Sequence, residues 1–371
     1  MRVKLGDIFE IGSGGTPSKS HPEYYGGDIP WVKTGDLKNE YLYEVEDFIT
    51  EEGLKNSAAK VYEADTVLIA MYGATIGATS ILKINACTNQ ACAAIKKNEQ
   101  VIPEYLYYFL RSKKKKFVKD GVGGAQPNIS AGYLKKVEME LPSIEDQRVI
   151  VDILEKISDI VIKRKQEIQS LDNLIKARFV EMFGNGHDGF CNTKRLGEFC
   201  KFQQGTQVPV EEQIEEQLEG YTRFLRIIDY TQAPQIPRYV SVKGRKIADD
   251  SVVIVRYGAT AGFVGHGYAG ILANNLFEVV PDESILSKDF LYLALKYGTF
   301  EQEVHDKAFG AAMPALSFGM MNDIGVVTPN VTAQNSFVDF VHQVNKSKVA
   351  VQKALDETQL LFDSLMQKYF G

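Results

Sequence analysis

Two stretches of the chain carry a long, regular alternation of hydrophobic and polar positions. They run from Ile144 to Phe183 and from Val331 to Phe370, and neither contains proline or glycine. Apolar residues recur in them at alternating steps of four and three, which is the heptad pattern of helices that pair along a seam. Each stretch has 40 residues, so a rise of about 1.5 Å per residue predicts a rod of about 60 Å.

The two seams keep the same register. The first comprises Ile150, Leu154, Ile157, Val161, Arg164, Ile168, Leu171, Ile175, Arg178 and Met182. The second comprises Phe337, Val341, Val344, Lys348, Val351, Leu355, Thr358, Phe362, Leu365 and Tyr369. Because an unpaired buried charge is costly, we expect Arg164, Arg178 and Lys348 to be paired or to reach solvent. The alternative to pairing is that each helix lies separately on its own globule.

The rest of the chain has shorter hydrophobic runs. DTVLIAMYG and DSVVIVRYG are bounded by glycine and asparagine and predict strands of mixed, mostly β globules. IPEYLYYFLRSKKKKFV and SKDFLYLALKYGTFEQEV predict one helix in each globule, and FGNGHDG (183–189) is interpreted as a linker. The pattern therefore predicts an α+β chain of four segments: globules at 1–143 and 185–330, and long helices at 144–184 and 331–371.

The chain also repeats itself. MYGATIG (71–77) recurs as RYGATAG (256–262), and Asn89 matches Asn274 at the same offset of 185 residues. KLGDIFEIGSG recurs as RLGEFCKFQQG, and GGAQPNIS (123–130) aligns with GAAMPALS (310–317). A full set of matches in one order indicates a tandem duplication of about 185 residues.

Composition narrows the function classes. The chain has 371 residues, 44% of them hydrophobic and 24% charged, which is typical of a globular protein. No apolar run reaches the roughly 18 residues of a membrane span, and the N-terminus lacks the apolar core of a signal peptide. The four cysteines and five histidines do not form zinc-ligand pairs, so we expect neither a metal site nor a disulfide framework, and a cytoplasmic location.

The charge balance is acidic. A net charge of −6 argues mildly against a generic nucleic-acid binder, which usually has a basic surface. A local basic run follows one predicted helix, at Lys113, Lys114, Lys115 and Lys116. It is either a solvated helix end or a phosphate contact.

Motifs of catalysis are missing from the sequence. GSGGTPSK (12–19) has glycines and a lysine in the wrong order for a phosphate-binding P-loop, and GATIGATS (73–80) has no lysine. We find no adenine-methyltransferase tetrapeptide, no nuclease carboxylate pattern and no Ser/His/Asp or Cys/His spacing. The sequence therefore predicts a non-catalytic protein, with no catalytic residues of its own.

Several motifs together resemble a known family, the specificity subunits of type I restriction–modification systems. The first copy resembles a target-recognition domain in LGDIFEIGSGGTPSKSHPEYYGGDIPWVKTGDL (5–37), YGATIG, Asn89–Gln90, GGAQPNIS and the helix entry LPSIEDQRVIVDIL. The second copy keeps LGEF, RYGATAG, Asn274 and TPNVTAQ, but QQGTQVPVEEQ lacks the G-T-P-S pattern and MPALS replaces QPNIS. The resemblance covers essentially the whole chain, and its most specific feature is the order globule, long helix, globule, long helix.

The resemblance implies two target-recognition globules separated by two long antiparallel coiled-coil helices, with a pseudo-twofold internal repeat. Each globule would read one half of a bipartite, asymmetric site on double-stranded DNA, and the helices would act as a spacer. The chain itself would bind no cofactor. Two methyltransferase (modification) subunits would supply S-adenosylmethionine, and restriction/translocase subunits would supply ATP and Mg²⁺.

Candidate DNA-binding residues are polar side chains in the loops that carry the resemblance, because such groups read base edges. In the first copy they are Thr16, Ser18, Lys19, Lys33, Thr34, Asp36, Tyr72, Thr75, Gln126 and Asn128, together with Lys113, Lys114, Lys115 and Lys116. In the second copy they are Gln204, Thr206, Gln207, Arg226, Asp229, Arg256, Tyr257 and Thr260. Residues common to both copies, such as Thr75 and Thr260, are also explained by a shared fold. Trp31 is either a stacking residue or part of the core.

Three other functions are compatible with the sequence. The chain could be a DNA-recognition module of another defence or methylation complex, which neighbouring genes would distinguish. It could be a stand-alone DNA methyltransferase with an unrecognised site, which would methylate DNA without partners. It could also be a structural coiled-coil adaptor without specific DNA binding.

Overall fold

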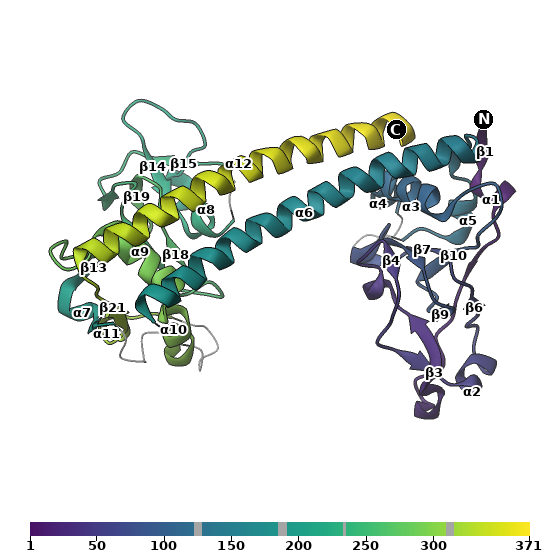
Figure 1. The fold of residues 1–371 in the computed structure, drawn as a ribbon, viewed down its shortest axis with the longest axis horizontal. Helices are drawn as coiled ribbons and strands as arrows, with labels where there is room; N and C mark the ends of the chain where they lie inside the picture. Colours follow the sequence, from purple (N-terminus) through teal and green to yellow (C-terminus); the bar gives the residue numbers. More distant parts are fainter. Residues whose placement is uncertain (122–127, 185–190, 233–234, 309–314) are drawn as a thin grey trace. The chain divides into compact units, whose positions relative to one another are not determined.

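The computed structural model describes residues 1–121, 128–184, 191–232, 235–308 and 315–371. The chain divides into two compact units (Figure 1). Unit 1 is Met1–Lys165 with Lys353–Gly371, and unit 2 is Gln166–Gln352. Each unit contains one globule and part of both long helices, so the boundaries between units fall inside the helices rather than at their ends.

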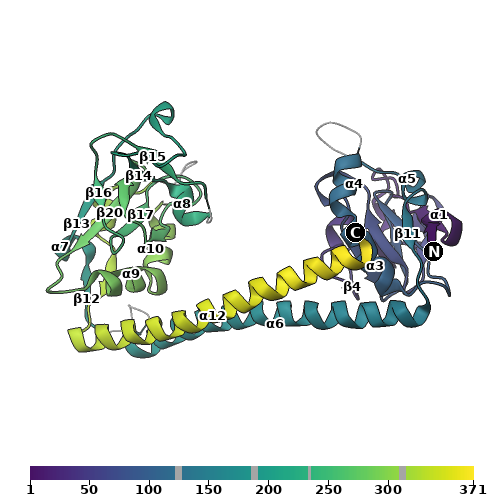
Figure 2. The ribbon, with the colours of Figure 1, turned by 90° about the horizontal axis from the view of Figure 1, so that it is seen from above.

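The two long helices begin and end where the hydrophobic periodicity indicates. They are α6 (Ile144–Phe183) and α12 (Val331–Phe370), and both have 40 residues. In unit 2, Phe183 lies against Phe337 with ring centroids 5.5 Å apart, and Asp172 pairs with Lys348 at 2.5 Å. Advancing along α12 therefore means going back along α6, so the helices run antiparallel there (Figure 2).

The seam residues of both helices are buried or half-buried, as predicted. In unit 1, Val151 and Leu154 of α6 share a core with Phe362 and Phe370 of α12. The alternative in which each helix lies alone on its globule is therefore wrong. Lys348 is paired across the seam, and Arg178 bonds Glu181 at 2.8 Å, as expected for basic residues near a hydrophobic seam.

Unit 1 builds its described strands into three sheets. β1 (Arg2–Lys4) pairs antiparallel with β11 (Glu138–Glu140). A five-stranded sheet has the order β2 (Ile11–Ser13), β10 (Cys92–Ile95), β7 (Val67–Ala70), β8 (Thr79–Leu82) and β4 (Tyr41–Leu42). A four-stranded sheet has the order β5 (Phe48–Ile49), β3 (Tyr25–Val32), β9 (Ala86–Thr88) and β6 (Val61–Tyr62). Its shorter helices are α1 (Leu5–Ile8), α2 (Glu51–Lys55), α3 (Pro103–Ser112), α4 (Lys114–Asp120) and α5 (Ala131–Lys135), with 3-10 turns η1 (Pro22–Tyr24), η2 (Thr34–Asp36) and η3 (Gly73–Thr75).

Unit 2 has the same plan. β12 (Thr193–Arg195) pairs antiparallel with β21 (Gly325–Val327). One four-stranded sheet has the order β13 (Cys200–Gln204), β20 (Leu276–Pro281), β17 (Val252–Val255) and β18 (Val264–Gly265). The other has the order β15 (Arg238–Val240), β14 (Thr222–Leu225), β19 (Gly270–Leu272) and β16 (Lys246–Ile247). Its shorter helices are α7 (Leu196–Phe199), α8 (Ile227–Thr231), α9 (Lys288–Tyr297), α10 (Phe300–Ala308) and α11 (Phe318–Asn322), with the 3-10 turn η4 (Val210–Glu212).

Apart from β4, which has no counterpart in unit 2, the described strands of the two globules correspond one to one. The order β2-β10-β7-β8 matches β13-β20-β17-β18, and β5-β3-β9-β6 matches β15-β14-β19-β16. A parallel pair recurs at the same place, as β3 with β9 and as β14 with β19. The duplication inferred from short motifs is therefore a duplication of the whole fold, and the predicted α+β class is confirmed.

Aromatic side chains anchor each globule to the helix pair. Tyr105 and Phe109 of α3 lie against Phe370, and Phe290 of α9 lies against Phe183 and Phe337. The predicted helix of each globule is broken in two, because α3 stops at Ser112 and α9 stops before Gly298. Within the described ranges, none of the helices has the length and apolar character that crossing a bilayer requires.

Candidate DNA interface

In unit 1, the loops that carry the candidate residues meet around Asn89 and Gln90, just after β9. Three contacts join them: Asn89 N–H to Val32 C=O at 3.0 Å, Thr16 Oγ1 to Gln90 Oε1, and Met71 N–H to Ala91 C=O at 2.8 Å. These contacts gather the ends of β2, β3 and β7, although their loops are far apart in the sequence. Thr16, Lys33 and Tyr72 therefore belong to one cluster of loops.

The same loops converge in unit 2 around Asn274 and Asn275. Four contacts join them: Thr206 N–H to Leu272 C=O at 2.7 Å, Gln204 Nε2 to Asn274 C=O at 3.1 Å, Ala273 N–H to Leu225 C=O at 3.0 Å, and Arg256 N–H to Asn275 C=O at 2.9 Å. Gln204, Thr206, Arg226 and Arg256 are thereby brought to one region. Each globule has an equivalent cluster of loops, which we call its reading edge.

Close backbone packing holds the first loop of each reading edge in place. A Cβ on Gly14 would lie 1.7 Å from the Thr88 carbonyl oxygen, and one on Gly205 would lie 2.1 Å from that of Ala273. Both distances are far below any permitted contact, so glycine is required at both positions. This requirement explains the repeated glycine after β2 and β13 without any role in DNA binding.

The YGATxG loops have the same conformation in both copies. Gly73 and Gly258 have φ of +65° and +87°, in the left-handed region that favours glycine. The Thr75 hydroxyl donates to the Tyr72 carbonyl at 3.1 Å, which stabilises the turn itself. Tyr72 and Tyr257 remain 43% and 38% exposed, so these loops present a tyrosine to solvent on each globule.

The other polar candidates differ in accessibility. Thr16, Thr34, Asp36 and Thr206 are half-buried, and Thr206 Oγ1 accepts the Arg245 N–H at 2.8 Å. Those with exposed side chains are Ser18, Lys19, Asn128, Gln204, Gln207 and Thr260. Gln126 lies outside the described residues. These exposed side chains are the most accessible of the polar candidates.

A basic residue follows the same strand in both globules. Lys33 comes directly after β3 and Arg226 directly after β14, and three residues later each copy has an aspartate. The backbone N–H of Lys33 donates to Asp36 Oδ2 at 2.7 Å, and that of Arg226 donates to Asp229 Oδ2 at 2.9 Å. The two positions are therefore structurally equivalent, although the basic side chain differs.

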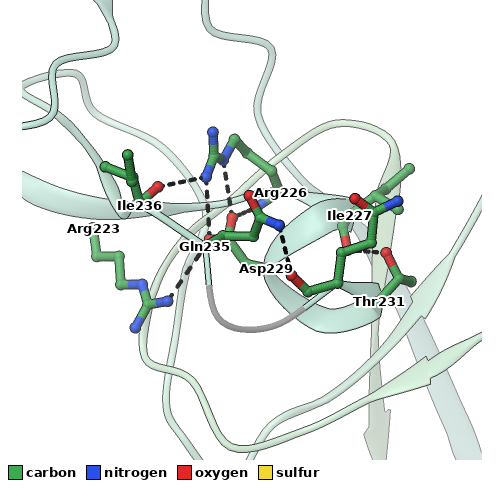
Figure 3. A network of polar contacts seen from close by, with 8 residues as sticks. Arg223, Arg226, Ile227, Asp229, Thr231, Gln235 and Ile236 are labelled. Atoms are coloured by element: carbon green, nitrogen blue, oxygen red, sulfur yellow. Dashed lines mark hydrogen bonds and ion pairs between the residues drawn. The ribbon is translucent and has the colours of Figure 1, made fainter. Parts of the chain in front are cut away.

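The side chains at these positions are held differently. The Lys33 ammonium pairs with Asp47, and the Lys33 side chain is 44% exposed. The Arg226 guanidinium instead donates to its own capping residue, from Nε to Asp229 Oδ2 at 2.9 Å and from Nη2 to Asp229 Oδ1 at 3.2 Å (Figure 3). The pairing with Asp47 raises the pKa of Lys33, so its side chain is a cation at neutral pH.

Three candidates have structural roles. Asp229 is only 2% exposed and contacts two arginines, so in this structure its carboxylate holds protein side chains and does not face solvent. Trp31 is 6% exposed and donates from Nε1 to the Gly15 carbonyl at 3.1 Å, which assigns it to the core. Lys113 Nζ donates to the Phe370 carbonyl, and burial lowers the pKa of Lys113. Lys113 is therefore a helix contact, whereas Lys114, Lys115 and Lys116 are exposed.

Two residues of the reading edges escaped the sequence analysis as binding candidates. Gln90 accepts the hydrogen bond of Thr16, and Arg223 lies 3.8 Å from Asp229 with its guanidinium over the Tyr268 ring. Gln90 directly follows Asn89, which recurs as Asn274, so its position next to a repeated residue was a signal that could have identified it. Arg223 had no such signal, because it lies within a strand. Among the described residues, no three His, Cys, Asp or Glu side chains gather to hold a metal ion.

Comparison with known proteins identifies relatives of the whole chain. The family model described as the type I restriction modification DNA specificity domain matches residues 1–173 and 191–358. The MjaIX type I restriction enzyme specificity subunit of Methanocaldococcus jannaschii is 26% identical over 400 aligned positions, covering 98% of this chain and 91% of the relative. The HindI specificity subunit of Haemophilus influenzae is 31% identical, covering 45% of this chain and 38% of its own length.

Solved structures share the fold. A chain from a study of complex assembly and conformational transition of the type I R-M system matches with a TM-score of 0.65 and 18% identity, covering 100% of this chain and 97% of that one. The S subunit of a type I restriction–modification system from M. genitalium matches with a TM-score of 0.57 and 16% identity. The match covers 100% of this chain and 96% of that subunit.

Proposed function

Because the chain belongs to the family of type I restriction–modification DNA specificity subunits, we propose that it reads a bipartite, asymmetric site on double-stranded DNA, one half-site with each globule. Subunits of this family recognise DNA and do not catalyse a reaction. The same loops converge in both globules, around Asn89 in unit 1 and around Asn274 in unit 2. This repeated reading edge is the observation that carries the proposal.

The differences between the two edges support an asymmetric site. A shared scaffold presents Lys33 in one copy and Arg226 in the other, and Met71 in one copy is replaced by Arg256 in the other. Base edges in the major groove are distinguished by the donors that face them, so different donors on the same scaffold favour different sequences. The shared Tyr72 and Tyr257 are better suited to features common to every duplex, such as phosphates and sugars.

The long helices are proposed to set the distance between the half-sites. A 40-residue helix is about 60 Å long, and one base pair advances about 3.4 Å along a DNA strand. Neither helix contains a glycine or a proline that would bend it. Such a pair can fix the number of unread base pairs between two readers.

Partner subunits complete the proposed activity. We propose that the chain scaffolds two methyltransferase subunits and the restriction/translocase subunits in the cytoplasm. S-adenosylmethionine, ATP and Mg²⁺ would be bound by those partners. The net charge of −6 fits a subunit that shares its phosphate contacts with others.

An exchange of globules tests the proposal. Residues 1–143 are replaced by the corresponding globule of a relative that recognises another site, leaving α6 and α12 intact. Mapping methylated adenines in a host that carries the complete system should show one altered half-site and one unchanged half-site. The reciprocal exchange of residues 185–330 should alter the other half. A single exchange that alters both half-sites would contradict the two-reader proposal.

A further inference from the structure

Asp229 lies between two arginines, Arg223 and Arg226, on the second reading edge. Its side chain is fully buried, and its two oxygens accept three hydrogen bonds from Arg226: 2.9 Å from the backbone N–H, 2.9 Å from Nε and 3.2 Å from Nη2 (Figure 3). Arg223 approaches the same carboxylate from another side, with its Nη2 3.8 Å from Asp229 Oδ1. A buried carboxylate with two guanidinium partners satisfies the charge that its burial requires.

The described contacts of the Arg226 guanidinium involve Nε and Nη2. Nη2 donates a second hydrogen bond, to the Ile236 carbonyl at 2.9 Å, so both of its hydrogens are engaged. Within the described part of the chain, Nη1 has no protein acceptor, and the Arg226 side chain is 19% exposed. Arg226 therefore presents a single nitrogen with two donors, in an orientation that Asp229 has already fixed.

The strand that precedes Arg226 belongs to the reading edge. Leu225, its neighbour, accepts the Ala273 N–H at 3.0 Å, and Thr206 N–H donates to Leu272 C=O at 2.7 Å. Arg226 thus lies next to the loops that carry Thr206 and Asn274. In unit 1 the equivalent Lys33 is more exposed, and its ammonium is held by Asp47 rather than by the capping Asp36.

We propose that Asp229 is a positioning residue that holds Arg226 to read a guanine in the second half-site. This inference rests on the proposed function of the reading edge. Guanine presents the acceptors O6 and N7 in the major groove, and arginine is its commonest specific partner. Because Asp229 and Ile236 occupy Nη2, the contact is made by Nη1 alone, to O6, the acceptor that adenine lacks. A side chain already fixed by the protein loses little rotamer freedom on binding, so discrimination is gained without an ordering cost. Unit 1 has a lysine, Lys33, at the place where unit 2 has Arg226. This difference gives the two half-sites different preferences at the equivalent base pair.

The experiment uses the complete complex with its methyltransferase subunits. Competition binding is measured with duplexes in which each base pair of both half-sites is varied singly. Asp229→Asn should reduce the preference at one G·C pair of the second half-site by about tenfold, and leave the first half-site unchanged. Arg226→Lys should relax the same pair, and the double variant should be no worse than Arg226→Lys alone.

Asp36→Asn is the matched control. It removes the charge of the equivalent capping carboxylate in unit 1, where the amide oxygen can still accept the Lys33 N–H, and it leaves the Lys33 ammonium paired with Asp47. If Asp229 served only as a cap, the two asparagine variants would have equal effects, each in its own half-site. The inference predicts that Asp36→Asn leaves the G·C preference in the second half-site unchanged, and that it relaxes its own half-site less than Asp229→Asn relaxes the second.

Each remaining outcome is decisive. A wild-type base preference at every position in Asp229→Asn would overturn the inference. So would an equal loss at all pairs of the second half-site together with a lower Tm, because that result indicates only a structural role. If Asp229→Asn does not fold, Arg226→Lys decides: relaxation confined to one pair supports the inference, and an unchanged profile overturns it. A wild-type complex with no preference in the second half-site would contradict the proposed function itself.

Discussion

Gln147 and Gln334 make the same three hydrogen bonds at equivalent positions near the starts of the two long helices. The Oε1 of Gln147 accepts the Ile102 N–H at 3.0 Å, and its Nε2 donates to the carbonyls of Gln100 and Pro142 at 2.8 and 3.1 Å. Gln334 repeats this pattern with the Ser287 N–H and the carbonyls of Ile285 and Pro329 at 3.1, 2.8 and 2.9 Å. Each glutamine therefore fastens a globule to its helix through backbone groups.

Replacing either glutamine should destabilise the protein. The side chains are 0% and 2% exposed, so Gln147→Met or Gln334→Met leaves three backbone groups without the partner that each has at this junction. We expect a loss of about 2–4 kcal/mol in the free energy of unfolding, measured by urea denaturation. Gln169→Met, on an exposed face of α6, is the matched control and should change the free energy of unfolding by less than about 0.5 kcal/mol. Equal stability of all three variants would contradict the fastening role.

Glu40 should make the stability of unit 1 depend on pH. Burial, and then the charge of Glu155, raise the pKa of Glu40 from 4.5 to about 7. Because the folded state holds the proton more tightly, the stabilisation from Glu40 is present below about pH 4.5 and is lost as the pH rises through about 7. Glu40→Gln keeps the shape and removes the titration.

We therefore expect Glu40→Gln to be more stable than the wild type at pH 8, by about 1–2 kcal/mol after allowance for solvent screening. The difference should shrink as the pH falls below about 7 and disappear only below about pH 4.5, where the carboxyl is protonated in both the folded and the unfolded state. Thermal unfolding between pH 5 and 8 provides the measurement, with the exposed Glu44→Gln as control. A difference that stays constant across this range would exclude Glu40 as the source.

Alanine substitutions at two glycines of the RYGATAG loop allow the cost of backbone strain to be compared with the cost of steric overlap. Gly258 and Gly262 have φ of +87° and +91°, but only a Cβ on Gly262 meets a neighbour, 2.7 Å from Val304 Cγ1. Gly258→Ala should cost about 1–2 kcal/mol of folding free energy from strain alone. Gly262→Ala should cost at least about 1 kcal/mol more, since Val304 must move. Denaturation of both variants checks the order, and the reverse order would contradict this account of the loop.

The sequence predicted the helices and the repeat because both depend on local pattern. Seam positions such as Leu154 and Phe337 recur at heptad spacing, and an uninterrupted run without glycine or proline marks where each helix begins and ends. The equivalence of Lys33 and Arg226 was hidden, because loops of different length precede them and shift the offset between copies. Only the matched strands β3 and β14 reveal it.

The burial of Asp229 could not be predicted from sequence either. An aspartate in a polar loop is a reasonable DNA contact until its surroundings are known. Arg223 encloses it from within a strand, and Tyr268, far along the chain, lies under that arginine at 4.3 Å. The role of Asp229 thus depends on contacts between distant segments, which no local pattern encodes.

The most direct test of the account inserts four residues into each long helix, after Lys165 and after Gln352. The chain passes between the two units at both points, so neither reading edge is changed. Four residues add about 6 Å and slightly more than one turn, and four is a step of the heptad pattern, so most of the seam is kept. A four-residue insertion after the exposed Gln217 is the control. Methylation mapping in the complete system should find both half-sites unchanged, separated by one or two additional base pairs, whereas the control keeps the original spacing. An active complex with doubly lengthened helices and an unaltered spacing would contradict the claim that these helices set the distance between two independent readers.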